Sequence, residues 1–185
     1  MDKSNTWKIV KSEPGPDLKL FRARFDHIQN PRNQAIERMV ILEGADSVNV
    51  VPVTPEQEII FVRQYRVGIG KETLELPGGL VDPGEDPRSA IMRELAEETG
   101  YTSTTWTPLG RVASNPVFMD NYIHHWAAHD VTWHNPQRLD DGEAIVLERY
   151  PVQEAERMLQ AGKFLHPHTI SCLYRYFQAF PVPPH

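Results

Sequence analysis

The chain of 185 residues contains a single cysteine, Cys172. A lone cysteine cannot form an internal disulfide, so the sequence fits a reducing compartment. Free cysteine usually behaves as a small buried hydrophobe, and Cys172 falls in a segment with helical apolar periodicity. We therefore expect Cys172 to pack in the core rather than to act as a nucleophile.

Long apolar runs are missing as well. No run approaches the roughly 20 residues that a helix needs to cross a membrane. The first residues also lack the apolar stretch of a secretory signal peptide. We therefore expect a cytoplasmic protein with no membrane partner.

The chain has no excess of positive charge: its net charge is −6 at pH 7. General nucleic-acid binders carry a basic patch or stripe, so we do not expect nucleic acid as a partner. An acidic protein can still bind an anionic substrate if arginines or metal ions neutralise that substrate locally. The hydrophobic fraction of 40% and the charged fraction of 24% are typical of a globular domain with a real core.

Short strands and turns dominate the first 47 residues. We predict strands at residues 7–11, 18–26 and 36–42, with a break at Pro14-Gly15-Pro16 between the first two. They form a small N-terminal antiparallel β-sheet (1–47) ahead of a main domain (48–185). A sheet of this size is marginally stable alone, so it should pack on the main domain or on a second subunit.

The main domain mixes strands with helices. We predict strands at residues 48–53, 59–65, 73–76, 106–112, 122–128 and 144–150, and helices at 152–161 and 169–180. Another helix begins after Asp86, a favourable N-cap, with Pro87 at its first position, and Gly100 ends it. This mixture indicates an α+β fold or a layered α/β sandwich.

Glutamates at helical spacing are the most informative feature of that helix. Glu94, Glu97 and Glu98 are spaced i, i+3, i+4 and fall on one face. Their mutual repulsion is relieved if they bind divalent cations, and Mg²⁺ prefers a few carboxylates together with phosphate oxygens. The alternative is a solvated acidic helix face. Glu85 and Arg93 can pair and hold the preceding loop against the helix.

The loop and helix together resemble the box of the Nudix hydrolase family. That box reads Gly, five residues, Glu, seven residues, Arg-Glu, an aliphatic residue, one residue, Glu-Glu, one residue, Gly and an aliphatic residue. The matching residues here are Gly79, Glu85, Arg93, Glu94, Leu95, Glu97, Glu98 and Gly100. The one departure is Tyr101, where the pattern has an aliphatic residue that serves packing.

The resemblance implies an α/β Nudix fold, a mixed sheet sandwiched between helices, and a Mg²⁺ (or Mn²⁺) cofactor. It implies that Glu94 and Glu98 bind the metal with help from Glu97. The carbonyl of Gly78 is a further implied ligand. Glu85 and Arg93 are implied to fix the loop, with Glu85 near the metals, so Glu85, Arg93 and Glu97 are counted with the catalytic residues.

Outside the box, the chain resembles ADP-ribose and nucleotide-sugar pyrophosphatases. The similarity rests on VRQYR at 62–66, on ELPGG at 75–79 and on Pro116, sixteen residues after the box glycine Gly100. It also rests on the acidic loop at 140–143. In that subfamily, a glutamate of this loop accepts the proton of the attacking water or binds a metal, a role that we assign to Glu143. Residues 114–121 depart from the usual ADP-ribose loop and look more like those of broad nucleoside-diphosphate-sugar hydrolases.

The resemblance also suggests which residues bind substrate, namely Arg63, Arg66, Glu75, Gly79 and Pro116. Plainer roles remain open: Arg63 is equally a surface cation, and Glu75 either reaches the ribose or serves the structure. His124, His125 and His129 look like a zinc cluster on paper. Strand alternation places His125 and His129 on one face and His124 on the other, which disfavours that alternative.

The expected function is Mg²⁺-dependent hydrolysis of the pyrophosphate bond of nucleoside diphosphate sugars of the ADP-ribose or GDP-mannose type. The products are a nucleoside monophosphate and a sugar phosphate. The alternatives are a nucleotide-sugar sensor that does not hydrolyse, and a Nudix hydrolase of dinucleoside polyphosphates, capped RNA or nucleoside triphosphates. The marginal N-terminal sheet predicts a homodimer, with that sheet exchanged between subunits as one option. In the resembling subfamily, the partner chain helps to bind the base.

Overall fold

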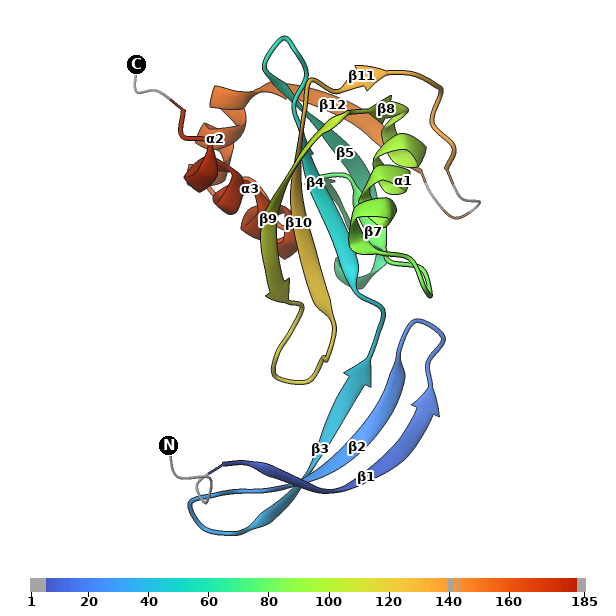
Figure 1. The fold of residues 1–185 in the computed structure, drawn as a ribbon, viewed down its shortest axis with the longest axis vertical. Coiled ribbons are helices and arrows are strands. Elements are labelled where there is room, and N and C mark those ends of the chain that lie inside the picture. The colour runs from blue at the N-terminus through green and yellow to red at the C-terminus, as the bar shows by residue number, and fades with distance from the viewer. Residues whose placement is uncertain (1–5, 140–141, 143, 183–185) are drawn as a thin grey trace. The chain divides into compact units, whose positions relative to one another are not determined.

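The computed structural model describes residues 6–139, 142 and 144–182. The chain divides into two compact units. The smaller unit comprises Met1–Ala45 with Ala113–Tyr122, and the larger comprises Asp46–Val112 with Ile123–His185 (Figure 1). The segment Ala113–Tyr122 therefore clusters with a part of the chain that precedes it by about 70 residues in sequence.

The smaller unit is built on a three-stranded antiparallel sheet with the order β1-β2-β3. Its strands are β1 (Lys8–Asp17), β2 (Arg22–Gln29) and β3 (Ile36–Glu43). The segment that clusters with it is held to β3 because the Leu42 N–H donates to the Phe118 carbonyl at 2.7 Å.

The predicted strand break at Pro14-Gly15-Pro16 is wrong. β1 continues through these residues with a register shift between Pro14 and Asp17. The chain turns later, where the Leu18 N–H donates to the Phe21 carbonyl at 2.8 Å. β1 is an edge strand, and an edge or a bulge is where a sheet tolerates proline, which has no N–H to donate.

The larger unit contains two main sheets with the orders β7-β4-β10-β9 and β12-β5-β6. The strands are β4 (Ser47–Pro52), β5 (Glu58–Arg66), β6 (Lys71–Glu75), β7 (Gly78–Leu80), β9 (Thr105–Ala113), β10 (Tyr122–His129) and β12 (Val146–Pro151). The short strands β8 (Tyr101–Thr102) and β11 (Thr132–Trp133) pair with each other. β4 and β10 run parallel, whereas β4 and β7 run antiparallel, so the sheet is mixed, as expected.

Helices cover both faces of these strands. α1 (Pro87–Thr99) lies on one side, and α2 (Val152–Gln160) and α3 (Pro167–Ala179) lie on the other (Figure 1). The side chains of β4 alternate between the two faces of the sheet, so β4 contributes to two hydrophobic clusters. Val48 and Val50 pack with residues of α1, and Val51 packs with residues of α2 and α3. The predicted sandwich of a mixed sheet between helices is confirmed. Within the described part of the chain, no helix has the length and apolar character to cross a bilayer.

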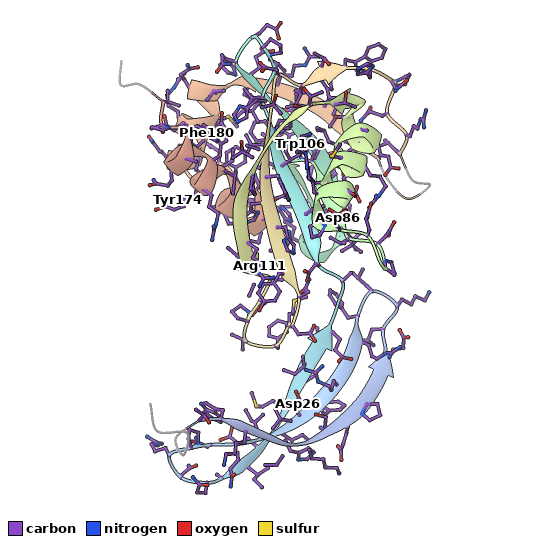
Figure 2. All side chains as sticks on the ribbon, in the orientation of Figure 1. Asp26, Asp86, Trp106, Arg111, Tyr174 and Phe180 are labelled. Carbon is purple, nitrogen blue, oxygen red and sulfur yellow. The ribbon has the colours of Figure 1, made fainter. Side chains whose placement is uncertain are left out.

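α1 begins and ends where its sequence predicts. The Asp86 carboxylate accepts from the backbone N–H groups of Arg88 and Ser89 at 3.0 and 3.2 Å, with Pro87 at the first helical position (Figure 2). Gly100 closes the helix in the left-handed conformation, with φ at 75°. The buried face of α1 includes Ala90, Ile91 and Leu95, and also Glu98 and Thr99.

Cys172 is fully buried in the cluster of α2 and α3. Burial raises the pKa of its thiol far above the ordinary value, so the thiolate is disfavoured. Cys172 is thus a packing residue, as expected.

Candidate active site

The site is built around the glycine turn, Gly78 and Gly79, which are the first two residues of the short strand β7 between β6 and α1. β7 pairs with β4 so closely that a Cβ atom on Gly78 would lie 2.1 Å from the Val48 carbonyl oxygen. A Cβ atom on Gly79 would lie 2.4 Å from a carboxylate oxygen of Glu94. Glycine at both positions therefore allows the chain to lie between β4 on one side and a helix carboxylate on the other.

Two glutamates of α1, one helical turn apart, meet this turn. The Gly78 N–H donates to Oε2 of Glu98 at 2.8 Å, and Glu98 is buried with 3% of its surface exposed. The Glu94 carboxylate packs against Gly79 from the same helix face. The structure thus brings together Gly78, Gly79, Glu94 and Glu98, all of which the sequence placed at the site.

Arg93 links the remaining acidic residues of the box. Its guanidinium donates to both carboxylate oxygens of Glu85 at 3.2 and 2.9 Å, and to Glu94 and Glu97 at 2.9 and 3.1 Å. It also donates to the Leu80 carbonyl at 3.1 Å. The hydrogen bonds from Arg93 lower the pKa of Glu85, and the pairing raises the pKa of Arg93. The Arg93 guanidinium therefore holds the loop that carries Glu85 against α1, and its charge partly balances the repulsion among the carboxylates.

Arg66 and Glu75 form a second cluster on the adjoining strands. Nε and Nη2 of Arg66 donate to the two carboxylate oxygens of Glu75 at 2.7 and 2.6 Å. Burial would raise the pKa of Glu75, but the hydrogen bonds from Arg66 and Thr73 outweigh burial, so this pKa is lowered. Glu75 is therefore a buried carboxylate that holds Arg66 in a bidentate pair.

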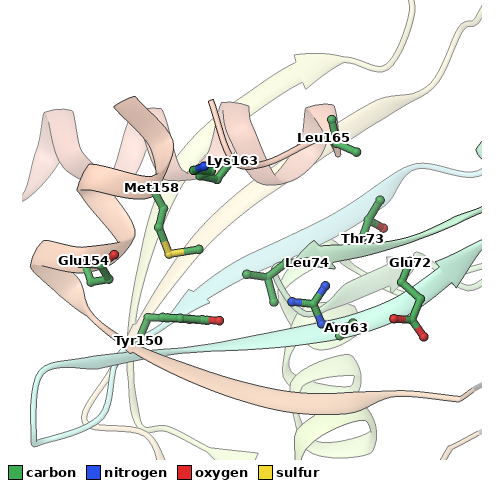
Figure 3. Close-up of a pocket in the computed structure, with 9 residues that line it drawn as sticks. All are labelled: Arg63, Glu72, Thr73, Leu74, Tyr150, Glu154, Met158, Lys163 and Leu165. Carbon is green, nitrogen blue, oxygen red and sulfur yellow. The ribbon is translucent and has the colours of Figure 1, made fainter. Parts of the chain in front are cut away.

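Arg63 is separated from Arg66 by the alternation of β5. The ladder between β5 and β6 is regular from Val62 to Arg66, so residues 63 and 66 face opposite sides of the sheet. Arg63 pairs with Glu148 of β12 and lines a pocket beside α2, together with Tyr150 and Met158 (Figure 3). Arg63 is therefore not brought to the glycine turn.

Other expected site residues fall elsewhere. Glu143 lies outside the described residues, and Pro116 belongs to the smaller unit. The histidines of β10 make separate contacts: His124 bonds to Asp46 at 2.8 Å, and His125 bonds to Asn49 at 2.6 Å.

A sequence model described as the NUDIX domain matches residues 44–170, a span that includes the glycine turn, α1 and both clusters. The chain belongs to the NUDIX family.

Two curated relatives match this NUDIX protein over most of their length. A protein named methanol dehydrogenase activator from Bacillus methanolicus is 30% identical, with 88% of each chain covered. An ADP-ribose pyrophosphatase from Bacillus subtilis (strain 168) is 28% identical, with 86% of each chain covered. A solved structure described as that of an ADP compounds hydrolase superposes with a TM-score of 0.82 at 22% identity, covering 95% of this chain and 96% of that one. This last likeness concerns the fold.

NUDIX hydrolases generally need a divalent metal, and the donor set of this NUDIX domain fits one. Its candidate ligands are all oxygen atoms: the carboxylates of Glu94, Glu97 and Glu98 and the Gly78 carbonyl. Across residues 6–139, 142 and 144–182, no three acidic, histidine or cysteine side chains lie together in a group that could hold a metal ion by themselves. Mg²⁺ does not need such a group, because it binds proteins through one or two carboxylates, keeps several waters and takes the rest of its ligands from substrate phosphates.

The structure adds residues to this NUDIX site that sequence reasoning missed. The C-terminal end of α1 is capped from outside: the Gln137 amide donates to the Glu98 carbonyl at 2.6 Å, and the Arg138 N–H donates to the Glu97 carbonyl at 2.8 Å. His166 of the α3 N-cap contacts Glu75. No local pattern indicates these contacts, because each joins segments that are more than 30 residues apart.

Proposed function

We propose that the protein hydrolyses the pyrophosphate bond of nucleoside diphosphate sugars, of the ADP-sugar type, with Mg²⁺ or Mn²⁺ as cofactor. The products are a nucleoside monophosphate and a sugar phosphate. The observation that carries this proposal is the contact of the Glu94 and Glu98 carboxylates with the Gly78-Gly79 turn. The ADP-ribose pyrophosphatase among its relatives supports the choice of substrate class.

In this proposal, Glu94 and Glu98 hold the cation, with Glu97 and the Gly78 carbonyl completing the protein ligands. The bound cation neutralises charge on the phosphate oxygens and lowers the pKa of water. Arg93 holds Glu85 and Glu97 by ion pairs to the same guanidinium. These side chains are fixed before substrate arrives, so little reorganisation is needed in the transition state.

The reaction needs a proton acceptor. A water oxygen attacks one phosphorus in line, the bond from that phosphorus to the bridging oxygen breaks, and the bridging oxygen leaves on the other phosphate. The proton of the water passes to a carboxylate. We assign that carboxylate to Glu143 in the acidic loop, with Glu97 as the alternative within the box.

Arg66 is the proposed contact for the phosphates or the sugar. A guanidinium suits phosphate oxygens because its donors form a planar fork. In this proposal Glu75 holds Arg66 in place through the bidentate pair and does not contact the substrate itself. Arg63 is left out of the proposed substrate contacts because it faces the other side of the sheet.

A homodimer is proposed on the apolar character of the small sheet. Ile9 and Val10 of β1 are 63% and 48% exposed, and Ile36 and Val40 of β3 are 58% and 44% exposed. Ile36 and Val40 share one face of β3, whereas Ile9 pairs with Ile28 and Ile28 pairs with Glu37 on the opposite face, so both faces of this sheet carry exposed apolar surface. Light scattering on the purified protein tests the proposal, and a monomeric mass at micromolar concentration would count against it.

The test of activity is a substrate panel with Mg²⁺, resolved by chromatography: ADP-ribose, GDP-mannose, ADP-glucose, UDP-glucose, NADH, a dinucleoside polyphosphate and a nucleoside triphosphate. The expected result is release of nucleoside monophosphate from the nucleotide sugars, with loss of activity in EDTA. The Glu98→Gln variant is the matched control against contaminating hydrolases. Binding of ADP-ribose without turnover would indicate a sensor instead. Cleavage of the triphosphate or polyphosphate alone would overturn the substrate class.

A further inference from the structure

The Glu75 carboxylate contacts three side chains on three elements, and two of them, Arg66 and Thr73, donate hydrogen bonds to it. Arg66 of β5 donates to both oxygens, Thr73 of β6 donates to Oε1, and Nδ1 of His166 lies 3.1 Å from Oε2. Glu75 is only 1% exposed. Each of its oxygens therefore accepts one hydrogen bond from Arg66 and contacts a second side chain, Thr73 at Oε1 and His166 at Oε2.

This arrangement fixes the plane of the carboxylate. A bidentate pair keeps guanidinium and carboxylate coplanar, so the orientation of Arg66 follows that of Glu75. Thr73 holds one oxygen and His166 holds the other, which prevents the carboxylate from turning about its bond to Cγ. The Arg66 side chain is 42% exposed, whereas Glu75 is buried, so the pair presents its cationic side outward.

His166 is itself held in place by the first turn of α3. The Thr169 hydroxyl accepts from the Leu76 N–H at 3.0 Å, next to Glu75 in the chain. The His168 carbonyl accepts from the Asn49 amide at 2.9 Å, and Asn49 pairs with Gly78 across β4 and β7. The start of α3 is thus joined to the end of β6 and to the strand beside the glycine turn.

We propose that His166 is a positioning residue that fixes, through Glu75, the orientation of Arg66 toward the phosphates or sugar of the substrate. The inference rests on the proposed function, since it takes Arg66 as a substrate contact. It adds the C-terminal helix to the parts of the fold that determine substrate affinity. The same Nδ1 lies 3.4 Å from the Thr169 hydroxyl oxygen and 3.1 Å from Glu75 Oε2, so His166 joins Glu75 to the first turn of α3.

The test compares two substitutions of His166 with a neighbouring control. His166→Ala removes the donor, whereas His166→Asn keeps an N–H group at the δ position. Leu165→Ala is the control, because it changes the residue next to His166 in the chain, which is 61% exposed. Steady-state hydrolysis of ADP-ribose gives kcat and KM, thermal unfolding gives Tm, and a titration gives the Mg²⁺ concentration for half-maximal rate.

We expect His166→Ala to raise KM for ADP-ribose by up to about tenfold, because Glu75 loses one of its three side-chain contacts and Arg66 is held less firmly. Its kcat and its Mg²⁺ requirement should stay near those of the wild type, and His166→Asn should restore KM to within about twofold. An unchanged KM in His166→Ala would overturn the proposal. So would a fall in Tm and kcat that His166→Asn does not rescue, because that pattern indicates a purely structural role.

The two proposals can fail separately. If the wild type releases no product from any nucleotide sugar, the proposed function is wrong. The affinity of ADP-ribose measured by calorimetry then takes the place of KM for the same variants. Equal affinity in wild type and His166→Ala would reject the positioning role on its own.

Discussion

Glu98 accepts a hydrogen bond from the Gly78 N–H at 2.8 Å, across 20 residues of sequence. This bond joins the last turn of α1 to the start of β7 through a side chain proposed to bind the metal. The same carboxylate is one of the proposed ligands of the cation. Glu98 therefore has two roles: it holds β7 against α1, and it is a proposed metal ligand.

Glu98→Gln is predicted to separate these two roles. The amide oxygen of glutamine still accepts from the Gly78 N–H, so the fold and Tm should change little. The lost charge removes a metal ligand, and we expect kcat to fall by more than about 100-fold, since even residues behind a metal ligand cost about 10–100-fold. Glu94→Gln should behave alike. Near-normal turnover in both variants, measured with ADP-ribose at saturating Mg²⁺, would exclude the metal assignment.

The two glycines of the turn should respond differently to alanine. Gly78→Ala places Cβ 2.1 Å from the Val48 carbonyl oxygen, so we expect the free energy of unfolding to fall by about 1–3 kcal/mol. Gly79→Ala instead meets the tip of the Glu94 side chain, which can move. It should keep its stability and lose activity.

Urea unfolding and turnover together test this contrast. Gly68→Ala is the control, because a Cβ there meets nothing within 4 Å. Equal stability of Gly78→Ala and Gly68→Ala would show that β7 and β4 can separate without cost.

Local signals predicted α1 and its carboxylates well. Its boundaries depend on Asp86, Pro87 and Gly100, each of which acts on backbone groups within a few residues. The proximity of Glu94 and Glu98 follows from helical spacing alone. These features could be read from the sequence because the interactions that form them are short in sequence.

Features that depend on partners distant in sequence were missed. β7 is a three-residue strand that exists because β4 lies beside it, and its composition gave no strand signal. The contact of Leu42 with Phe118 joins segments more than 70 residues apart. The placement of Arg63 and Arg66 on opposite faces of β5, in contrast, could have been predicted from the sequence. They are three residues apart, and residues an odd number of positions apart on a strand face opposite sides.

Tyr101, the single departure from the box pattern, has a polar partner. Its hydroxyl accepts a hydrogen bond from the Arg149 guanidinium, which also lies 5.4 Å from the ring centroid. We predict that Tyr101→Phe lowers the free energy of unfolding by about 1 kcal/mol, because it removes one hydrogen bond and keeps the packing. A double-mutant cycle with Arg149→Met should give a coupling energy of about 0.5 kcal/mol or more. Additive effects would mean that the pair contributes nothing to stability.

His125 is predicted to make folding stability depend on pH. It is 1% exposed, with Nδ1 2.6 Å from Asn49 Oδ1 and Nε2 3.0 Å from the Ser171 hydroxyl. Burial, and secondarily the charge of Arg175, lower its pKa from 6.5 to about 4. Between these two values the unfolded chain binds more protons than the folded one, so stability falls as pH drops through this window and levels off below about 4 for this group.

Urea unfolding between about pH 7 and pH 4.5 measures the dependence on pH, and His125 should account for a loss of the order of 1–3 kcal/mol. His168, whose pKa burial also lowers to about 4, adds to the same slope. In His125→Gln the slope of stability against pH should become shallower, because the titrating group is gone while one hydrogen bond can persist. His134→Gln, which removes an exposed histidine, is the control. If both variants retained the full wild-type slope, the acid sensitivity would have to originate in other groups, and the buried imidazole of His125 would not be its source.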